Sequence, residues 1–173
     1  MTARIEMACA AQDDFPTVME LLVEAANWHQ SLGLHQWWPE LFTEYLYTRI
    51  EDDVANGDVF VARIGREIVG TLTLGWSDES VWGEQEQGAG YVHRFAVTRA
   101  WKGHRIGETM LDWAGDHCAL AGKPFLRLDT MSSNKKLCTY YERLGFVFQG
   151  INLVPRWKPA MYQRPSGHPN PSP

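Results

Sequence analysis

The sequence predicts one α/β domain in which a mixed β-sheet carries helices on both faces. The chain has 173 residues, 45% of them hydrophobic, which suffices to bury one continuous core. Strand-like and helix-like patterns follow one another in the order β-α-α-β-β-β-α-β-α-β-β. One β-α-β unit lies in the middle of this order, and the combination implies a mixed sheet covered by helices.

The N-terminal part is expected to form a strand and a helix. Residues 4–9 alternate polar and apolar side chains, which indicates a short strand. Residues 12–14 then supply side chains suited to capping a helix start. That helix should end near Gly33. At helical spacing, its buried face is expected to carry Phe15, Val18, Leu22 and Ala25.

A second helix and a hairpin are expected next. The helix should end at Gly57, because glycine interrupts helical structure. Two β-rich runs on either side of residues 65–67 then indicate a hairpin with a tight turn. The elements expected here are a helix after Pro39, strands at residues 59–64 and 68–74, a loop at 76–90 and a strand at 91–97.

The C-terminal half is expected to alternate helices and strands. Ile106, Met110 and Trp113 recur at helical spacing and predict the first of these helices. Residues 165–173 are rich in Pro, Gly and Ser, so we expect a disordered tail after a single domain over residues 1–164. The elements expected here are helices at residues 106–121 and 134–144 and strands at 125–129, 146–149 and 154–162.

Charge and composition narrow the classes of partner. The formal net charge is −5 with acidic residues spread along the chain, which argues against a nucleic-acid-binding surface. No run approaches the roughly 20 apolar residues of a membrane helix, and no signal peptide is evident. The six His show no metal-ligand spacing, so no metal is expected. We expect a cytoplasmic protein. Its three cysteines, Cys9, Cys118 and Cys138, are then expected to be free thiols.

A basic, glycine-containing loop at residues 101–107 joins an expected strand to an expected helix. Unpaired N–H groups at a helix start attract phosphate, and glycine allows the backbone to approach it closely. Lys102, His104 and Arg105 add positive charge at the same place. One interpretation is a pyrophosphate-binding turn; the other is an ordinary strand–helix connection. The loop by itself does not decide between them.

A second motif follows one strand later, at Asn134, Leu137, Tyr141, Gly145 and Phe146. With the loop pattern, it resembles the GNAT superfamily of N-acetyltransferases. That family carries V-x-x-x-x-[RQ]-x-x-G-x-[GA] and later N-x-x-[AL]-x-x-x-Y-x-x-x-G-F. The resemblance implies a mostly antiparallel central sheet of about six to seven strands and acetyl-CoA as co-substrate.

The loop departs from the family pattern at two positions. Lys102 stands where the family has Arg or Gln, and Arg105 stands where it has Gly. Both changes keep positive charge and the backbone N–H groups, although Arg105 then needs a backbone angle that a residue with a Cβ can adopt. The residues implied in cofactor binding are Phe95, Ala96, Val97, Lys102, Gly103, His104, Arg105, Ile106, Gly107 and Asn134.

The resemblance also implies two catalytic residues. Tyr141 would protonate the leaving thiolate; a core aromatic role and the neighbouring Tyr140 are the alternatives. His93 would share one strand face with Tyr91, Phe95 and Val97 and would act as general base toward the amine. A structural histidine is the alternative for His93, and Asp129 and Glu86 are other candidates for the base.

The acceptor pocket is expected from the first two helices, their connection and the loop at residues 76–90. Trp28, Trp37 and Trp38 are candidates for an aromatic wall around an amine, or else pack in the core. The predicted activity is transfer of an acetyl group from acetyl-CoA to a small-molecule amine. The alternatives are acetylation of a protein N-terminus or lysine, and a non-catalytic acyl-CoA-binding module. A homodimer is an expectation by analogy with the family.

Overall fold

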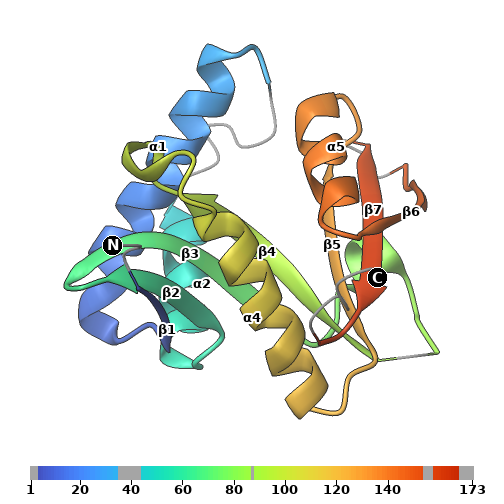
Figure 1. The fold of residues 1–173 in the computed structure, drawn as a ribbon, viewed down its shortest axis with the longest axis horizontal. Helices are drawn as coiled ribbons and strands as arrows, with labels where there is room; N and C mark the ends of the chain where they lie inside the picture. The colour runs from blue at the N-terminus through green and yellow to red at the C-terminus, as the bar shows by residue number, and fades with distance from the viewer. Residues whose placement is uncertain (1–3, 35–43, 87, 154–157, 168–173) are drawn as a thin grey trace. The chain divides into compact units, whose positions relative to one another are not determined.

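A computed structural model gives the fold of the chain and describes residues 4–34, 44–86, 88–153 and 158–167. Seven strands form a sheet in the order β1-β2-β3-β4-β5-β7-β6, flanked by helices (Figure 1). The strands are β1 Ile5–Cys9, β2 Val59–Ile64, β3 Glu67–Gly75, β4 Ala89–Val97, β5 Phe125–Met131, β6 Val147–Ile151 and β7 Pro159–Pro165. The helices are α1 Phe15–Ser31, α2 Glu44–Ala55, α3 Glu79–Trp82, α4 Ile106–Leu120 and α5 Lys135–Arg143.

The sheet is mostly antiparallel, as expected. Strand β1 pairs antiparallel with β2, β2 with β3, β5 with β7, and β6 with β7. The pairing of β4 with β5 is parallel, because α4 returns the chain to the same end of the sheet. The predicted mixed α/β class is therefore confirmed.

The chain divides into two compact units, which we describe separately. The first comprises residues 1–74 and 94–110, and the second comprises residues 75–93 and 111–173. Strand β4 and helix α4 each contribute residues to both units. The single domain expected over residues 1–164 stays a prediction.

The core of the first unit joins α1 and α2 to β2 and to the end of β4. Its central residues are fully shielded, with Ile50 and Val61 at 0% exposure. Gly70 in β3 lets α4 approach closely, because a Cβ there would lie 2.6 Å from the sulfur of Met110. The buried cluster comprises Ala10, Val18, Met19, Leu22, Ile50, Val54, Val59, Val61 and Ala96.

Strand β4 is irregular at Arg94, whose φ of +47° lies in the left-handed region. The Arg94 side chain forms an ion pair with Asp53 of α2 and donates a hydrogen bond to Thr73 Oγ1 (3.2 Å). Strict alternation of side chains therefore stops at this residue. The expectation that His93 shares a continuous face with Phe95 and Val97 is wrong for this reason.

The second unit contains a short helix where the sequence predicted a loop over residues 76–90. Helix α3 spans four residues, and Asp78 caps it by accepting a hydrogen bond from the Val81 N–H (3.3 Å). Val81 and Trp82 are buried and pack with Tyr91 of β4. Four residues are too few for the 3.6-residue period to show in the sequence, but the Asp-x-x-Val cap was visible.

The C-terminal strands also differ from prediction in their limits. Strand β7 covers residues 159–165 rather than 154–162, and residues 154–157 lie outside the described part. The first residues of the expected disordered tail, 165–167, have a defined structure. Pro165 ends β7, and the Gly167 N–H donates to the Gly115 carbonyl (2.9 Å). Residues 168–173 lie outside the described part. Helix α4 thus anchors the chain up to Gly167.

Candidate functional site

The basic loop forms a tight turn that leads directly into α4. Gly103 has a φ of +88° and Arg105 a φ of +57°, so the chain twice enters the left-handed region before the helix begins. Arg105 therefore adopts the angle that glycine would take with less strain. Its guanidinium pairs with Glu108 in the first turn of α4, with Nε 2.8 Å from Oε2.

The N–H groups in this turn fall into two sets. Lys102 donates to the Arg99 carbonyl (3.1 Å) and His104 donates to the Trp101 carbonyl (3.3 Å), so these two stabilise the turn itself. The first intrahelical bond runs from the Thr109 N–H to the Arg105 carbonyl (3.1 Å). Earlier N–H groups of a helix have no intrahelical acceptor. The donors suited to an anion are therefore those at Gly103, Ile106 and Gly107.

Glu24 of α1 holds the start of this turn. Its Oε1 accepts from the Arg99 N–H (3.0 Å), and its Oε2 accepts from the Thr98 hydroxyl (3.1 Å). Because the carboxylate is bonded to both residues after β4, it fixes where the strand ends. Phe95, Ala96 and Val97, the expected partners of a pantetheine chain, form the last residues of that strand. Ala96 is buried, and the other two are half-buried.

Trp28 lies beside the same turn. The guanidinium carbon of Arg99 stands 3.3 Å from the centroid of the Trp28 ring, and the side chain remains 38% exposed. Arg99 thus occupies one face of this ring. Trp37 and Trp38, the other expected acceptor-site residues, lie outside the described residues.

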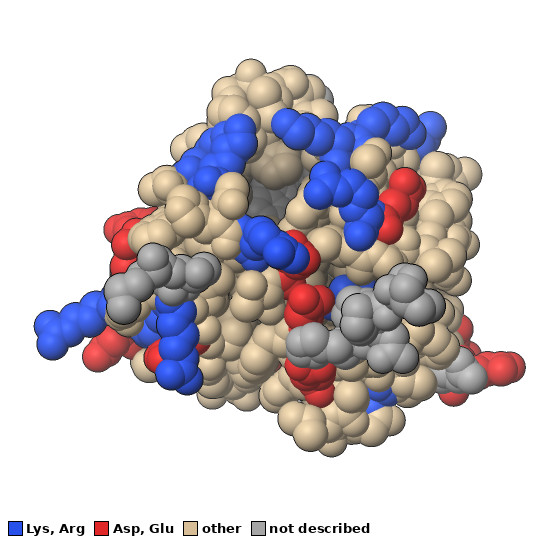
Figure 2. All heavy atoms as spheres, in the orientation of Figure 1, with Lys and Arg blue, Asp and Glu red and all other residues tan. Residues whose placement is uncertain are grey.

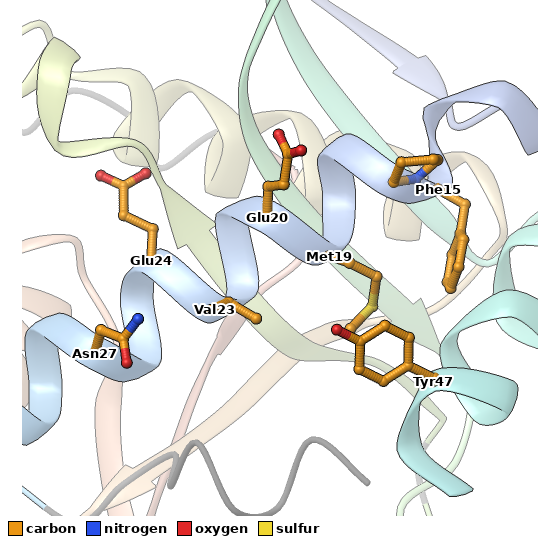
Figure 3. Close-up of a pocket in the computed structure, with 8 residues that line it drawn as sticks. Phe15, Met19, Glu20, Val23, Glu24, Asn27 and Tyr47 are labelled. Carbon is orange, nitrogen blue, oxygen red and sulfur yellow. The ribbon is translucent and has the colours of Figure 1, made fainter. Parts of the chain in front are cut away.

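A groove runs along α1 in the first unit. It has a volume of about 790 Å³, and Figure 3 shows Met19 and Phe15 turned toward Tyr47 of α2, whereas Glu20 and Glu24 point away from them. The first two helices form this groove, and its use as the expected acceptor pocket stays a prediction. It is lined by Phe15, Pro16, Met19, Glu20, Val23, Glu24, Asn27 and Tyr47.

In the second unit, Tyr141 lies on the inner side of α5. It is 4% exposed, and its ring contacts those of Tyr140, Phe146 and Tyr162. Burial, with smaller contributions from neighbouring groups that include Asp129, raises the pKa of Tyr141 far above its ordinary value. The phenol therefore stays protonated at neutral pH and can act as a donor.

Asn134 begins the same helix. Its Oδ1 accepts a hydrogen bond from the Leu137 N–H (3.2 Å), which is the standard arrangement of a helix cap. The side chain is 6% exposed. The N-x-x-L spacing of the motif is therefore explained locally by capping, and the expected contact with pantetheine stays a prediction.

Asp78, His93 and Asp129 meet in the second unit. Each offers one nitrogen or oxygen, and these atoms all lie within 4.8 Å of one another. His93 Nε2 lies 4.0 Å from Asp78 Oδ2. Asp78 comes from the segment before α3, His93 from β4 and Asp129 from β5. The residue expected to act as base is thus placed beside two carboxyl groups.

The carboxyl group of Asp129 is shifted toward its neutral form. Burial, followed by the charge of Asp78, raises its pKa to about 7. A carboxyl that titrates near neutral pH can both hold and release a proton under physiological conditions. Glu86, the other alternative for the base, is exposed at the surface.

Comparison with known proteins matches residues 17–146 to the model of the Acetyltransferase (GNAT) family. The chain belongs to the GNAT acetyltransferase family. It is also 30% identical to the uncharacterized N-acetyltransferase YesJ of Bacillus subtilis (strain 168) over 152 residues, which are 84% of this chain and 83% of YesJ. This GNAT protein is accordingly an acetyltransferase.

Solved structures share the GNAT fold. A GNAT-family acetyltransferase from Listeria monocytogenes 4b F2365 aligns with a TM-score of 0.76 and 24% identity, covering 93% of this chain and 94% of that one. The structure of yncA from Salmonella typhimurium with its cofactor acetyl-CoA aligns with a TM-score of 0.68 and 16% identity, covering 98% of each chain. At these identities the likeness establishes the fold.

Two further observations concern the surface charge and the helices of this GNAT protein. Lys and Arg side chains occur together with Asp and Glu side chains on the face drawn in Figure 2. Within the described ranges, none of the helices has the length and apolar character needed to cross a bilayer.

Sequence reasoning missed three residues that organise the GNAT elements, namely Glu24, Asp78 and Arg94. Each acts through partners 15 to 75 positions away, as in the bond between Glu24 and Arg99 or the approach of Asp78 to His93. No local sequence pattern predicts contacts between residues so far apart in the chain. The cap at Asp78 was the one available signal, since Asp is a preferred residue at helix starts.

Proposed function

We propose that this GNAT protein transfers the acetyl group of acetyl-CoA to the primary amine of a small molecule. The turn before α4 carries this proposal most strongly. It combines two residues at positive φ, exposed Lys102 and the N-terminus of a 15-residue helix. That donor set suits the pyrophosphate of a CoA thioester.

The proposed binding roles follow from the donors in the first unit. The N–H groups of Gly103, Ile106 and Gly107 bind pyrophosphate oxygens, and Lys102 adds a mobile positive charge. The backbone of Phe95, Ala96 and Val97 pairs with the pantetheine chain as an additional strand would. His104 and Arg105 shape the turn through their bonds to Trp101 and Glu108. Asn134 remains a candidate contact of pantetheine.

The proposed reaction is direct attack of a neutral amine on the thioester carbonyl. The new C–N bond forms, the C–S bond breaks, and the thiolate takes up a proton. Tyr141 supports this last step by donating its hydrogen bond to the sulfur. Because its raised pKa exceeds that of a thiol, donation without complete proton loss is the favoured role.

His93 is the proposed general base. Its Nε2 faces Asp78 Oδ2 at 4.0 Å, so a carboxylate is placed to stabilise the imidazolium once it forms. The side chain is 31% exposed, which leaves a route for the proton to solvent. Asp129 is the competing candidate, because its pKa of about 7 also suits proton acceptance.

Acetylation of a protein N-terminus is the second candidate. The groove along α1 is open at the surface rather than enclosed, and an open groove admits a peptide more readily than a closed pocket does. A non-catalytic acyl-CoA-binding module is the third alternative. It has less support, because a pure binding module has no need for a base beside two carboxyl groups.

A turnover screen tests the proposed function. Purified protein is incubated with acetyl-CoA and either a pool of primary alkyl and aryl amines or a pool of peptides with free N-termini, and CoA thiol release is measured. We expect release with the small amines. Release with the peptides alone would favour the second candidate, and binding of CoA without release in either pool would favour the binding module.

The proposal also covers the cellular location and the oligomeric state of the protein. Cys9, Cys118 and Cys138 are free thiols, which supports a reducing, cytoplasmic setting. The homodimer expected by analogy stays a prediction, and light scattering coupled to size-exclusion chromatography measures it directly.

A further inference from the structure

The Asp78–His93–Asp129 cluster contains an unsatisfied buried oxygen. Asp78 Oδ1 accepts from the Ser80 hydroxyl (2.8 Å) and the Val81 N–H, which fixes the carboxylate at the start of α3. Asp78 Oδ2 is buried and accepts no hydrogen bond from the residues that the structure describes. The side chain is 8% exposed. A buried carboxylate oxygen without a hydrogen bond lowers the stability of the fold, so a ligand that donates a hydrogen bond to it would bind favourably.

The spacing of the cluster can be compared with what a cationic ligand requires. Charge-assisted N–H···O bonds of about 2.8 Å from a tetrahedral ammonium place its three acceptors about 4.4–4.7 Å apart. Neighbouring ligands of a small metal ion at about 2.1 Å lie about 3.0–3.5 Å apart. The three atoms here lie within 4.8 Å of one another, with 4.0 Å between His93 Nε2 and Asp78 Oδ2. The 4.0 Å separation lies between the two ranges, so an ammonium group fits the cluster and a metal ion is the alternative that the test below includes.

We propose that Asp78, Asp129 and His93 form a receptor for a primary ammonium group, the protonated amine of the acetyl acceptor. Each residue accepts one of its three N–H donors. The receptor therefore selects primary amines over tertiary or quaternary ones, which lack these donors. This inference rests on the proposed function, since it names the acceptor class of the same site.

Electrostatics supports a cationic ligand. Asp78 and Asp129 repel each other when both are ionised, and this repulsion contributes to the raised pKa of Asp129. A bound cation removes the repulsion and favours ionisation of both carboxyl groups. The proton that Asp129 otherwise holds is then released on binding.

The receptor also prepares the amine for reaction. One N–H bond of the ammonium breaks as its proton moves to His93 Nε2, which becomes imidazolium between two carboxylates. The lone pair left on nitrogen forms the C–N bond with the thioester carbonyl carbon, and the C–S bond breaks. A second nitrogen proton reaches the thiolate, and His93 returns the first to solvent. Free amide and CoA thiol remain.

Histidine NMR tests the receptor without acetyl transfer. The protein is labelled with ¹⁵N-histidine, and the His93 ring signal is identified among the six histidines by its loss in His93→Gln. n-Butylammonium chloride is titrated at constant ionic strength and without acetyl-CoA, in parallel with tetramethylammonium chloride and ZnCl₂. Asp78→Asn and Asp129→Asn are compared with Glu79→Gln, which removes an exposed carboxyl next to the cluster. Thermal melting confirms that each variant is folded.

We expect a saturable shift of the His93 signal with n-butylammonium but not with tetramethylammonium. Affinity should fall about tenfold or more in each Asp variant and stay unchanged in Glu79→Gln, because each lost bond is charge-assisted. Equal shifts with tetramethylammonium, unchanged affinity in both Asp variants, or a response to zinc alone would overturn the receptor. Thermal stabilisation by acetyl-CoA is measured on the same samples. If acetyl-CoA stabilises the protein while n-butylammonium fails, the inference alone is wrong; the reverse result refutes the proposed function.

Discussion

At the scale of single residues, environment decides the chemistry that each side chain can perform. Tyr141 and Tyr140 are neighbours of the same type, yet Tyr141 is buried among aromatic rings and Tyr140 is half-buried. Asp129 is a carboxyl group that lies beside Asp78 in the second unit, and its pKa rises to about 7. Burial distinguishes the two tyrosines and is the main cause of the raised pKa of Asp129, and burial is set by the fold.

Tyr141→Phe tests the proposed acid. The substitution keeps the ring in its aromatic surroundings and removes the hydroxyl, so kcat should fall about a hundredfold or more while KM for acetyl-CoA changes little. Steady-state kinetics with the amine found in the turnover screen measures both constants. Tyr140→Phe is the matched control. A larger loss of kcat in Tyr140→Phe would transfer the role to that residue.

Asp129→Asn tests the buried carboxyl through stability. In the folded protein the pKa of Asp129 is raised to about 7, above the value of about 3.9 for an unfolded chain, so the folded state holds its proton more tightly. The contribution of Asp129 to the free energy of unfolding is therefore greatest below pH 4 and is lost as the pH rises to 7. The difference is on the order of 4 kcal/mol. Asp129→Asn should therefore raise the free energy of unfolding at pH 8 and flatten its dependence between pH 4 and 7.

Urea denaturation at a series of pH values measures this effect. Glu79→Gln, which removes an exposed carboxyl, should follow the parent protein at every pH. A difference between Asp129→Asn and the parent that is the same at pH 4 and pH 8 would contradict the shifted pKa.

At the scale of elements, the limits of helices and strands that depend on local patterns could be predicted, whereas features that depend on long-range contacts could not. The limits of β1, β2 and α1 agree with prediction to within about two residues, because alternation, helical spacing and caps are local properties. The irregularity at Arg94 has no such signature. It occurs at the residue that forms an ion pair with Asp53, 41 positions earlier in the chain.

Asp53→Asn tests how that ion pair holds β4 to α2. Both side chains are largely buried, with 21% exposure for Arg94 and 16% for Asp53, so removal of the carboxylate leaves a buried guanidinium without its partner. We expect a loss of about 3 kcal/mol in the free energy of unfolding, measured by chemical denaturation. Asp52→Asn, at an exposed neighbouring acid, should cost less than about 0.5 kcal/mol. Equal effects of the two substitutions would show that the pair contributes no stability.

At the scale of the whole molecule, the family and its fold were predictable, whereas the Asp78–His93–Asp129 cluster was not. The loop and the Asn134–Tyr141 motif are short, contiguous patterns that specify a turn and a helix start. The cluster joins residues from three elements, and sequence reasoning singled out His93 and Asp129 without Asp78. Sequence patterns also gave no sign that Arg99 stacks on one face of Trp28, whose role in the acceptor pocket stays a prediction.

Acetyl-CoA binding is the central claim, and thermal unfolding tests it most directly. The melting temperature is measured with acetyl-CoA, CoA, ATP and NAD at equal concentration. We expect acetyl-CoA and CoA to raise it and the two nucleotides to leave it nearly unchanged, since a ligand at a hundred times its Kd stabilises the folded state by about 2.7 kcal/mol. Absence of any shift with acetyl-CoA and CoA, or an equal shift with ATP, would contradict the account.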